Sequence, residues 1–220
     1  MNARLVGYVD HFVLAAPDLD RACAQFETAT GIRPAFGGAH PGRGTHNALV
    51  SFDDSSYLEI IAPDPAQPAT GMSAPMARLS QPTLMHWAVR CSGLAAVVSR
   101  LQELGWTPTD VRRMQRTPPD GVQLNWALFG VHRHRYGGLV PFFIDWMNSP
   151  HPAVTSPRVG PIVNVGLASP EPSQLRALMT ELGIAIEVRP GEPRLTLAFT
   201  SPRGEICYEG VAPTGFTLGD

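Results

Sequence analysis

Three strand-like runs of the chain carry a polar side chain at their centre, and each run opens a unit that closes with an acid. The central residues are His11, His86 and Asn164. The closing acids are Glu59, Asp145 and Glu209. Imidazoles and carboxylates bind first-row metal ions and transfer protons near neutral pH, so this repeat predicts a metal site or an acid–base site.

The alternation of side chains along a strand decides which of these residues can meet. If the first and last strands of a unit both lie inside the sheet, one register puts His11 and Glu59 on the same concave face. The same geometry brings in His86 and Asp145 from the second unit. Two imidazoles with one or two carboxylates suit Fe, Mn, Ni, Co or Zn as the divalent metal ion, and they leave coordination positions open for a substrate.

The elements between these residues follow the order βαβββ in each unit. A helical pattern comes after the first strand, and its predicted stops are the glycines Gly31, Gly105 and Gly183. One helix covers only one face of a unit's sheet, so two units placed edge to edge would curl into a cup with the helices outside. The sequence therefore predicts an α+β fold whose centre is a cup-shaped mixed β-sheet.

Proline-rich connections set the expected boundaries between these units. Residues 1–147 are expected to hold two paired modules, at about 8–62 and 84–147, and residues 148–220 a linker and a third, shorter βαβββ-like module. Because the cup needs modules in pairs, the third module would either sit beside the first two or pair with its own copy in a homodimer.

The stretch from Gly37 to Asn47 is too glycine-rich for regular structure and is interpreted as a loop. It contains the candidate substrate-binding residues His40, Arg43, His46 and Asn47. With the backbone amides, these side chains could hold an anionic or oxygenated substrate over the cup. Alternatively, the glycines only allow a tight crossing between two strands.

Several of these stretches together resemble a known family. They are Val9-Asp10-His11, the loop Gly-Gly-x-His-Pro-Gly-x-Gly-Thr-x-Asn at 37–47, Tyr57-Leu58-Glu59-Ile60 and the run 141–146. This set is similar to the bacterial glyoxalase-like domain family of the vicinal oxygen chelate superfamily. That superfamily includes glyoxalase I, extradiol dioxygenases and antibiotic-resistance binding proteins. The resemblance covers roughly residues 8–147 and continues more weakly to Glu209.

The resemblance implies metal ligands on the first and last strands of paired modules. Carried over by position, these ligands are His11, Glu59 and His86, with Asp145 as a fourth candidate. Two departures stand out. Asp145 is one methylene shorter than the glutamate usual at its position, and Asn164 of the third module is a poor ligand.

Composition narrows the expected partners to small molecules. The chain has 220 residues, 44% of them hydrophobic, and a formal net charge of −2, so neither nucleic acid nor an acidic membrane is an expected partner. No apolar run reaches the roughly 18 residues of a membrane span, and the N-terminus lacks a signal-peptide core. We expect a cytoplasmic protein that binds a small-molecule substrate.

These observations predict a metal-dependent enzyme acting on a small carbonyl or diol substrate, by lyase or isomerase chemistry. Glu59 or Asp145 is the candidate base that moves a proton beside the polarised carbonyl. Ring-cleaving oxygenation of the extradiol type is one alternative. The other is a metal-free protein that sequesters a small hydrophobic molecule in the same cup.

Overall fold

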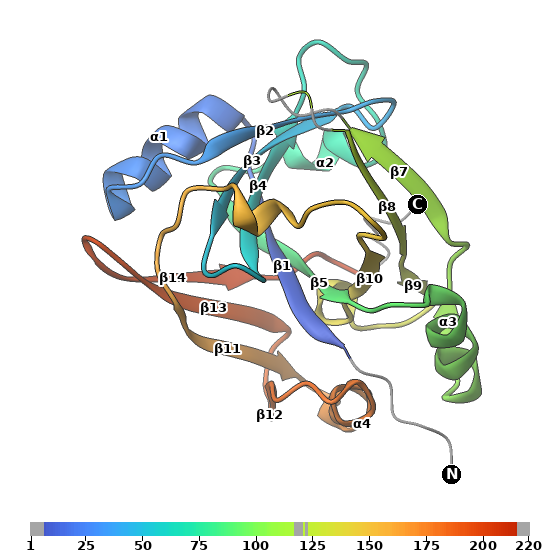
Figure 1. The fold of residues 1–220 in the computed structure, drawn as a ribbon. Coiled ribbons are helices and arrows are strands. Elements are labelled where there is room, and N and C mark those ends of the chain that lie inside the picture. Colours follow the sequence, from blue (N-terminus) through green and yellow to red (C-terminus); the bar gives the residue numbers. More distant parts are fainter. Residues whose placement is uncertain (1–6, 117–120, 122, 215–220) are drawn as a thin grey trace.

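A computed structural model describes residues 7–116, 121 and 123–214 (Figure 1). The first module consists of β1 (Tyr8–Ala15), α1 (Leu19–Thr30), β2 (Ala35–His40), β3 (Thr45–Ser51) and β4 (Tyr57–Pro63). After the short helix α2 (Ser73–Met76), the second module consists of β5 (Thr83–Arg90), α3 (Leu94–Glu103), β6 (Thr107–Pro108), β7 (Arg112–Arg116), β8 (Leu124–Phe129), β9 (Val131–His132) and β10 (Phe142–Asp145). The third consists of β11 (Ile162–Ser169), α4 (Pro172–Leu182), β12 (Glu187–Pro190), β13 (Arg194–Ser201) and β14 (Gly204–Gly210).

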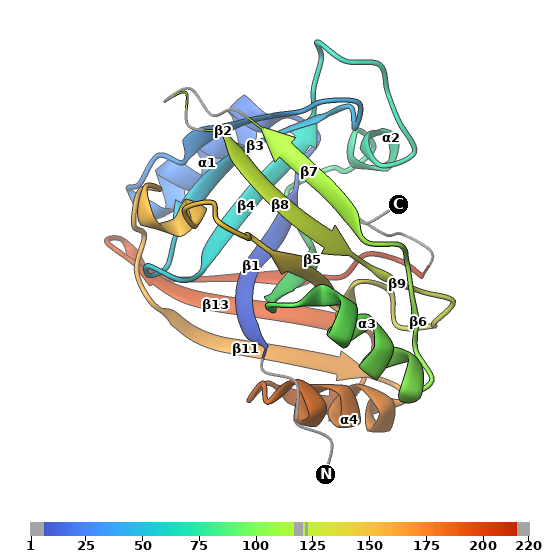
Figure 2. The same cartoon turned by 45° about the vertical axis from the view of Figure 1, so that its right-hand side comes forward.

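Eight strands of the first two modules form one curved sheet in the order β2-β3-β4-β1-β5-β10-β8-β7. The two modules meet at β1 and β5, which pair antiparallel in the middle of the sheet. In each module the last strand pairs parallel with the first, β4 with β1 and β10 with β5. The sheet curls until its edge strands β2 and β7 approach each other (Figure 2). This arrangement confirms the predicted α+β fold with a cup-shaped mixed sheet.

Helix α1 forms where the sequence supplies a cap at each end. The Asp18 carboxylate accepts a hydrogen bond from the Arg21 amide at 2.8 Å and so caps the start of α1. Gly31 ends the same helix in the left-handed conformation, with φ of 83°. α1 buries its apolar side, including Phe26, against the convex face of the sheet. Within the described part of the chain, no helix has the length and hydropathy to span a bilayer.

The third module is built differently from the first two and packs against them within the chain. Its four strands have the order β12-β11-β13-β14, so its last strand lies at an edge and not beside the first. Its sheet lies across the convex face of the main sheet, where the Phe199 ring packs against Phe26 and Phe52 at 6.1 and 5.2 Å between centroids. One hydrophobic core therefore runs through all three modules.

The glycine-rich stretch from Gly37 to Asn47 is mostly regular structure, contrary to the interpretation as a loop. β2 continues to His40 and β3 begins at Thr45, so only the four residues between them turn. Gly42 and Gly44 supply positive φ values of 75° and 67° in that turn. The glycines thus permit a tight hairpin, whose residues alternate between the two faces of the sheet.

Candidate functional site

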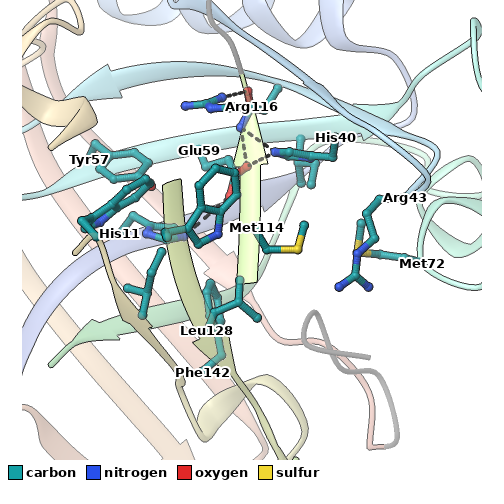
Figure 3. A pocket seen from close by; sticks show the side chains of 15 residues that line it. His11, His40, Arg43, Tyr57, Glu59, Met72, Met114, Arg116, Leu128 and Phe142 are labelled. Carbon is teal, nitrogen blue, oxygen red and sulfur yellow. Dashed lines mark hydrogen bonds and ion pairs between the residues drawn. The ribbon is translucent and has the colours of Figure 1, made fainter. Parts of the chain in front are cut away.

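The concave face of the main sheet holds a pocket with a cavity volume of about 80 Å³ (Figure 3). Its polar lining residues are His11, His40, Arg43, Asn47, Glu59 and Arg116. Its other walls are Tyr57, Ile61, Met72, Met114, Trp126, Leu128, Phe142, Ile144 and Trp146. A pocket with one cluster of polar groups and largely apolar walls fits a small molecule that has an oxygenated group and an apolar body.

The Asp10 carboxylate binds the ring nitrogen of His11 that faces away from the pocket. The register of β1 against β5 shifts between Val9 and His11, and this bulge lets the adjacent side chains of Asp10 and His11 meet. Asp10 is fully buried, and its Oδ1 accepts a hydrogen bond from His11 Nδ1 at 2.6 Å. The Nδ1 proton of His11 is thereby fixed, which turns Nε2 toward the pocket.

Two further N–H groups donate to the other oxygen of the same carboxylate. The distances to Asp10 Oδ2 are 2.9 Å from His151 Nε2 and 3.1 Å from Trp146 Nε1. Burial alone would raise the pKa of Asp10, but the hydrogen bonds and charges of His11 and His151 outweigh it and hold that pKa well below its ordinary value. Asp10 is therefore an ionised carboxylate at neutral pH.

Glu59 lies between two imidazoles at the polar end of the pocket. β4 carries it beside β1, opposite Val13. Its Oε2 is 3.6 Å from His11 Nε2, and its Oε1 is 3.7 Å from His40 Nε2. Asn47 Nδ2 donates a hydrogen bond to Oε1 at 2.5 Å. Carboxylate and imidazole are thus within reach of proton exchange through a substrate or a water molecule.

Arg116 fixes the orientation of the Asn47 amide from the far edge of the sheet. It lies on β7, and its Nη1 donates to Asn47 Oδ1 at 2.7 Å, which leaves the Asn47 amino group to face Glu59. Gly37 makes this approach feasible, since a Cβ atom at that residue would lie 2.6 Å from Arg116 Nη1. The three side chains Arg116, Asn47 and Glu59 form a hydrogen-bonded chain across the seam between β2 and β7.

Burial controls the protonation of two more pocket residues. It lowers the pKa of His40, while the Glu59 charge acts in the opposite direction, so the imidazole is neutral at pH 7. Burial also raises the pKa of Tyr57 well above its ordinary value, helped by the charges of Asp10 and Glu59. The Tyr57 ring stacks on His11 with centroids 4.6 Å apart, and its hydroxyl remains a hydrogen-bond donor.

Of the four predicted substrate-binding residues, three line the pocket and one does not. His40, Arg43 and Asn47 are lining residues. His46 follows the alternation of β3 to the opposite face, where its ring lies edge-on to Phe36 at 6.2 Å. The prediction treated the stretch as an irregular loop, and this missed the alternation that separates His46 from its neighbours.

The structure does not bring His86 into the pocket lining. His86 lies opposite Val13 on β5, and the Phe142 ring packs against both imidazoles, at 5.4 Å from His86 and 5.3 Å from His11. The Trp87 amide donates to His86 Nδ1 at 3.0 Å. Burial lowers the pKa of His86 to about 4, so it is a neutral core residue at pH 7.

Asp145 does not reach the pocket. Phe142 and Ile144 of β10 line the pocket, so the alternation of the strand turns Asp145 to the opposite face. There its carboxylate accepts hydrogen bonds from the amides of Met147 at 2.8 Å and Gly93 at 3.3 Å. Asp145 therefore holds backbone groups near the start of α3 and is removed from the candidate ligands and bases.

The described residues do not fit the expected divalent ion. In the ranges that the structure covers, no group of three or more His, Cys, Asp or Glu side chains is arranged to hold a metal. Of the predicted ligands, His11 and Glu59 face each other, whereas His86 is occupied in the core. The Asn47 amino group also donates a hydrogen bond to Oε1 of the Glu59 carboxylate. The predicted set of three ligands is thus not assembled.

Sequence reasoning missed Asp10, Arg116 and His151 as parts of the site. Asp10 is next to His11 and would point away from it without the bulge, which no local pattern indicates. Arg116 joins the site only because the sheet curls until β7 meets β2. His151 lies in the proline-rich linker after β10, where the sequence signal predicts a surface connection.

The paired-module sheet with a pocket on its concave face is the architecture expected of the vicinal oxygen chelate superfamily. Residues 9–183 match the model of the family described as glyoxalase-like domain, and the chain belongs to that family. The predicted resemblance is thereby confirmed. No curated protein matches the chain.

The chain is also similar to solved structures at low sequence identity. A hypothetical protein from Staphylococcus aureus is 16% identical, with a TM-score of 0.66 over 94% of this chain and 100% of that chain. A methylmalonyl-CoA epimerase variant from Streptomyces coelicolor, in complex with 2-nitronate-propionyl-CoA, is 17% identical, with a TM-score of 0.49 over 64% of this chain and 97% of that chain. The epimerase from Mycobacterium tuberculosis is 22% identical, with a TM-score of 0.43 over 66% of this chain and 90% of that chain.

Proposed function

We propose that this chain is an enzyme that moves a proton at the carbon next to a carbonyl group of a small oxygenated substrate, which is lyase or isomerase chemistry. The observation that carries the proposal is the Glu59 carboxylate, held 3.6 Å from His11 and 3.7 Å from His40 in a pocket with largely apolar walls. Such a carboxylate can take a proton from carbon, and a neighbouring imidazole can return one to the product.

Glu59 is the base in this proposal and His11 is its acid partner. When Glu59 accepts the C–H proton, the electron pair of that bond forms the enolate; the Nε2 proton of the His11 imidazolium then passes to a carbon or the oxygen of the enolate and leaves a neutral imidazole. The ionised Asp10 stabilises the imidazolium form of His11 through the 2.6 Å hydrogen bond to Nδ1. Asp10 itself is a positioning residue that acts through His11.

Donors that line the pocket can stabilise the developing enolate oxygen. The Tyr57 hydroxyl keeps its proton because its pKa is raised by burial. Arg116 lines the same pocket and carries a permanent positive charge. Fixed donors in a pocket with little water stabilise a developing negative charge more strongly than solvent does. No step is assigned to a metal ion, because the described residues gather no three-ligand set.

The test is exchange of carbon-bound protons with solvent. A panel of small ketones and 2-oxo acids in D₂O, followed by NMR, should include compounds that the wild-type protein deuterates faster than buffer does. Glu59→Gln should lower this rate at least about 100-fold, since general acid–base groups contribute that much or more. Asp145→Asn is the matched acid control and should stay within about twofold, because Asp145 bonds only backbone amides on the far face.

A metal-free binding protein is the second candidate, favoured by the aromatic side chains Trp126, Trp146 and Phe142 in the pocket wall. Such a protein would bind hydrophobic members of the panel and leave every proton-exchange rate at the buffer value. Metal analysis of protein purified without chelator, with His11→Ala as control, belongs to the same experiment. A stoichiometric ion that His11→Ala removes would contradict the metal-free proton transfer proposed above.

A further inference from the structure

Arg116 is a buried cation whose charge has no direct counter-ion among the described residues. Only 6% of the residue is exposed. Within the ranges that the structure covers, its one side-chain hydrogen bond is from Nη1 to the neutral Asn47 Oδ1 at 2.7 Å, and none of the ion pairs involves it. A guanidinium has five N–H donors, so most of its donor capacity is unused.

Arg116 is both nearly buried and part of the pocket lining. Among the described residues, no fully buried side-chain nitrogen or oxygen lacks a hydrogen-bond partner. Any guanidinium nitrogen of Arg116 that lacks a partner therefore keeps some access to solvent, and Arg116 is one of the residues that line the pocket. Burying a cation costs free energy unless an anion or several hydrogen-bond acceptors replace the water that it loses.

The neighbouring carboxylates leave room for such an anion. Glu59 is separated from Arg116 by the Asn47 side chain, which accepts from one and donates to the other. Asp10 is engaged by His11 and His151 on the other side of Glu59. An anionic group on the ligand would thus supply the counter-ion that Arg116 lacks. The planar guanidinium can bind a carboxylate through two parallel hydrogen bonds.

The other lining residues of the pocket indicate what kind of body the ligand has. β7, β8 and β10 supply the apolar lining residues Met114, Leu128 and Phe142 (Figure 3). β8 also contributes Trp126 to the lining. The Trp126 ring is itself packed against Trp146 at 5.5 Å between centroids, which makes that wall rigid and aromatic. A flat or apolar body gains the most from such a wall.

We infer that the pocket takes the anion of a small carboxylic acid with an aromatic or otherwise apolar body, and that Arg116 pairs with its carboxylate. This inference rests on the proposed function and deepens it by naming the substrate class of the same site. A carbonyl beside the carboxylate would then lie toward Glu59, on the other side of Asn47. The competing explanation is that Arg116 only ties β7 to β3.

The experiment uses a probe pair that differs in charge and hardly in shape. Benzoylformate is an aromatic 2-oxo acid, and benzoylformamide is its neutral counterpart. Benzoylformate has no C–H beside its ketone, so it reports binding alone. Titration calorimetry and quenching of tryptophan fluorescence would measure both probes on the wild-type chain. We expect the acid to bind at least about tenfold more tightly than the amide.

The variants separate recognition from structure. Arg116→Gln should weaken benzoylformate at least about tenfold and leave benzoylformamide within about twofold, whereas Arg116→Lys should give an intermediate loss because it keeps the charge without the planar fork. Asp145→Asn should change neither affinity. Equal affinity of the wild-type chain for acid and amide, or no binding of either below about 10 mM, would overturn the inference without any variant. If Arg116→Gln weakened the binding of both probes equally, the role of Arg116 would be only to tie β7 to β3.

The two proposals can fail separately. If Glu59→Gln abolishes proton exchange in a neutral ketone while benzoylformate and its amide bind equally, the proposed function stands and the carboxylate inference falls. If binding depends on charge and on Arg116 but no compound exchanges protons faster than buffer, the carboxylate inference stands and the enzymatic proposal falls.

Discussion

The first and second modules have the same strand order around the cup, yet the first supplies mainly polar side chains to the pocket and the second mainly apolar ones. The pocket residues of the first module include His11, His40, Asn47 and Glu59. The second module contributes mainly apolar walls, with Arg116 as its charged residue in the lining. A repeated fold therefore does not give a repeated site, because each strand presents only every second side chain to the pocket.

A displacement of one residue explains most of this difference. The concave residues of β4 are Tyr57, Glu59 and Ile61, and those of β10 are Phe142 and Ile144. The acid of the second module comes one residue after Ile144 and so falls on the convex face. A shift of one residue along a strand moves its side chains to the other face, and here it separates a carboxylate in the pocket from one that binds backbone amides.

The largest effect should come from removing the feature that distinguishes the two histidines. Nδ1 of His11 binds the Asp10 carboxylate, whereas Nδ1 of His86 lies against the backbone N–H and carbonyl groups of Trp87. Asp10→Ala should lower the proton-exchange rate at least about 100-fold and reduce the free energy of unfolding by about 3–5 kcal/mol, because it leaves a buried donor cluster without its acceptor. Urea denaturation and the exchange assay would measure the two effects.

Asp145→Ala provides the comparison from the second module. It removes an acid that bonds two backbone amides, so it should cost stability and leave the exchange rate nearly unchanged. An Asp10→Ala protein with normal exchange would show that the buried carboxylate does not act through His11.

The next effect concerns His86 and acid. Its folded pKa of about 4 lies below the ordinary value of 6.5, so the unfolded chain binds a proton that the folded chain does not between these two values. Stability should therefore be complete above about pH 6.5 and fall toward pH 4, by on the order of 3 kcal/mol from this residue. His86→Gln should reduce that loss in urea melts at pH 7 and 4.5, and the exchange rate at pH 7 should persist. Loss of activity in this variant would restore His86 to the site.

The smallest effect compares two histidines of one hairpin. His40 faces Glu59 in the pocket, and His46 faces Phe36 on the other side of β3. His40→Gln should lower the catalytic efficiency about tenfold, which corresponds to about 1.4 kcal/mol of transition-state stabilisation. His46→Gln should stay within about twofold. Equal losses would mean that the hairpin acts through its shape and not through the His40 ring.

The sequence alone could predict the fold because the repeat of strand, helix and glycine stop is local and occurs three times. Caps such as Asp18 and Gly31 behaved as their types predict. The site was harder, since the placement of His11 and Glu59 follows from strand alternation, while Asp10 depends on a bulge and Arg116 on closure of the sheet. Such features depend on long-range pairing and leave no periodic signal in a single sequence.

The Asp10 carboxylate also sets the order in which the site can be assembled. Its partners come from the first strand, from Trp146 just after β10 and from His151 in the connection that leads to the third module. During synthesis the histidine at residue 11 leaves the ribosome long before residues 146 and 151. A nascent chain that stops short of them carries His11 and Asp10 without the Trp146 and His151 donors that bind the second oxygen of the carboxylate.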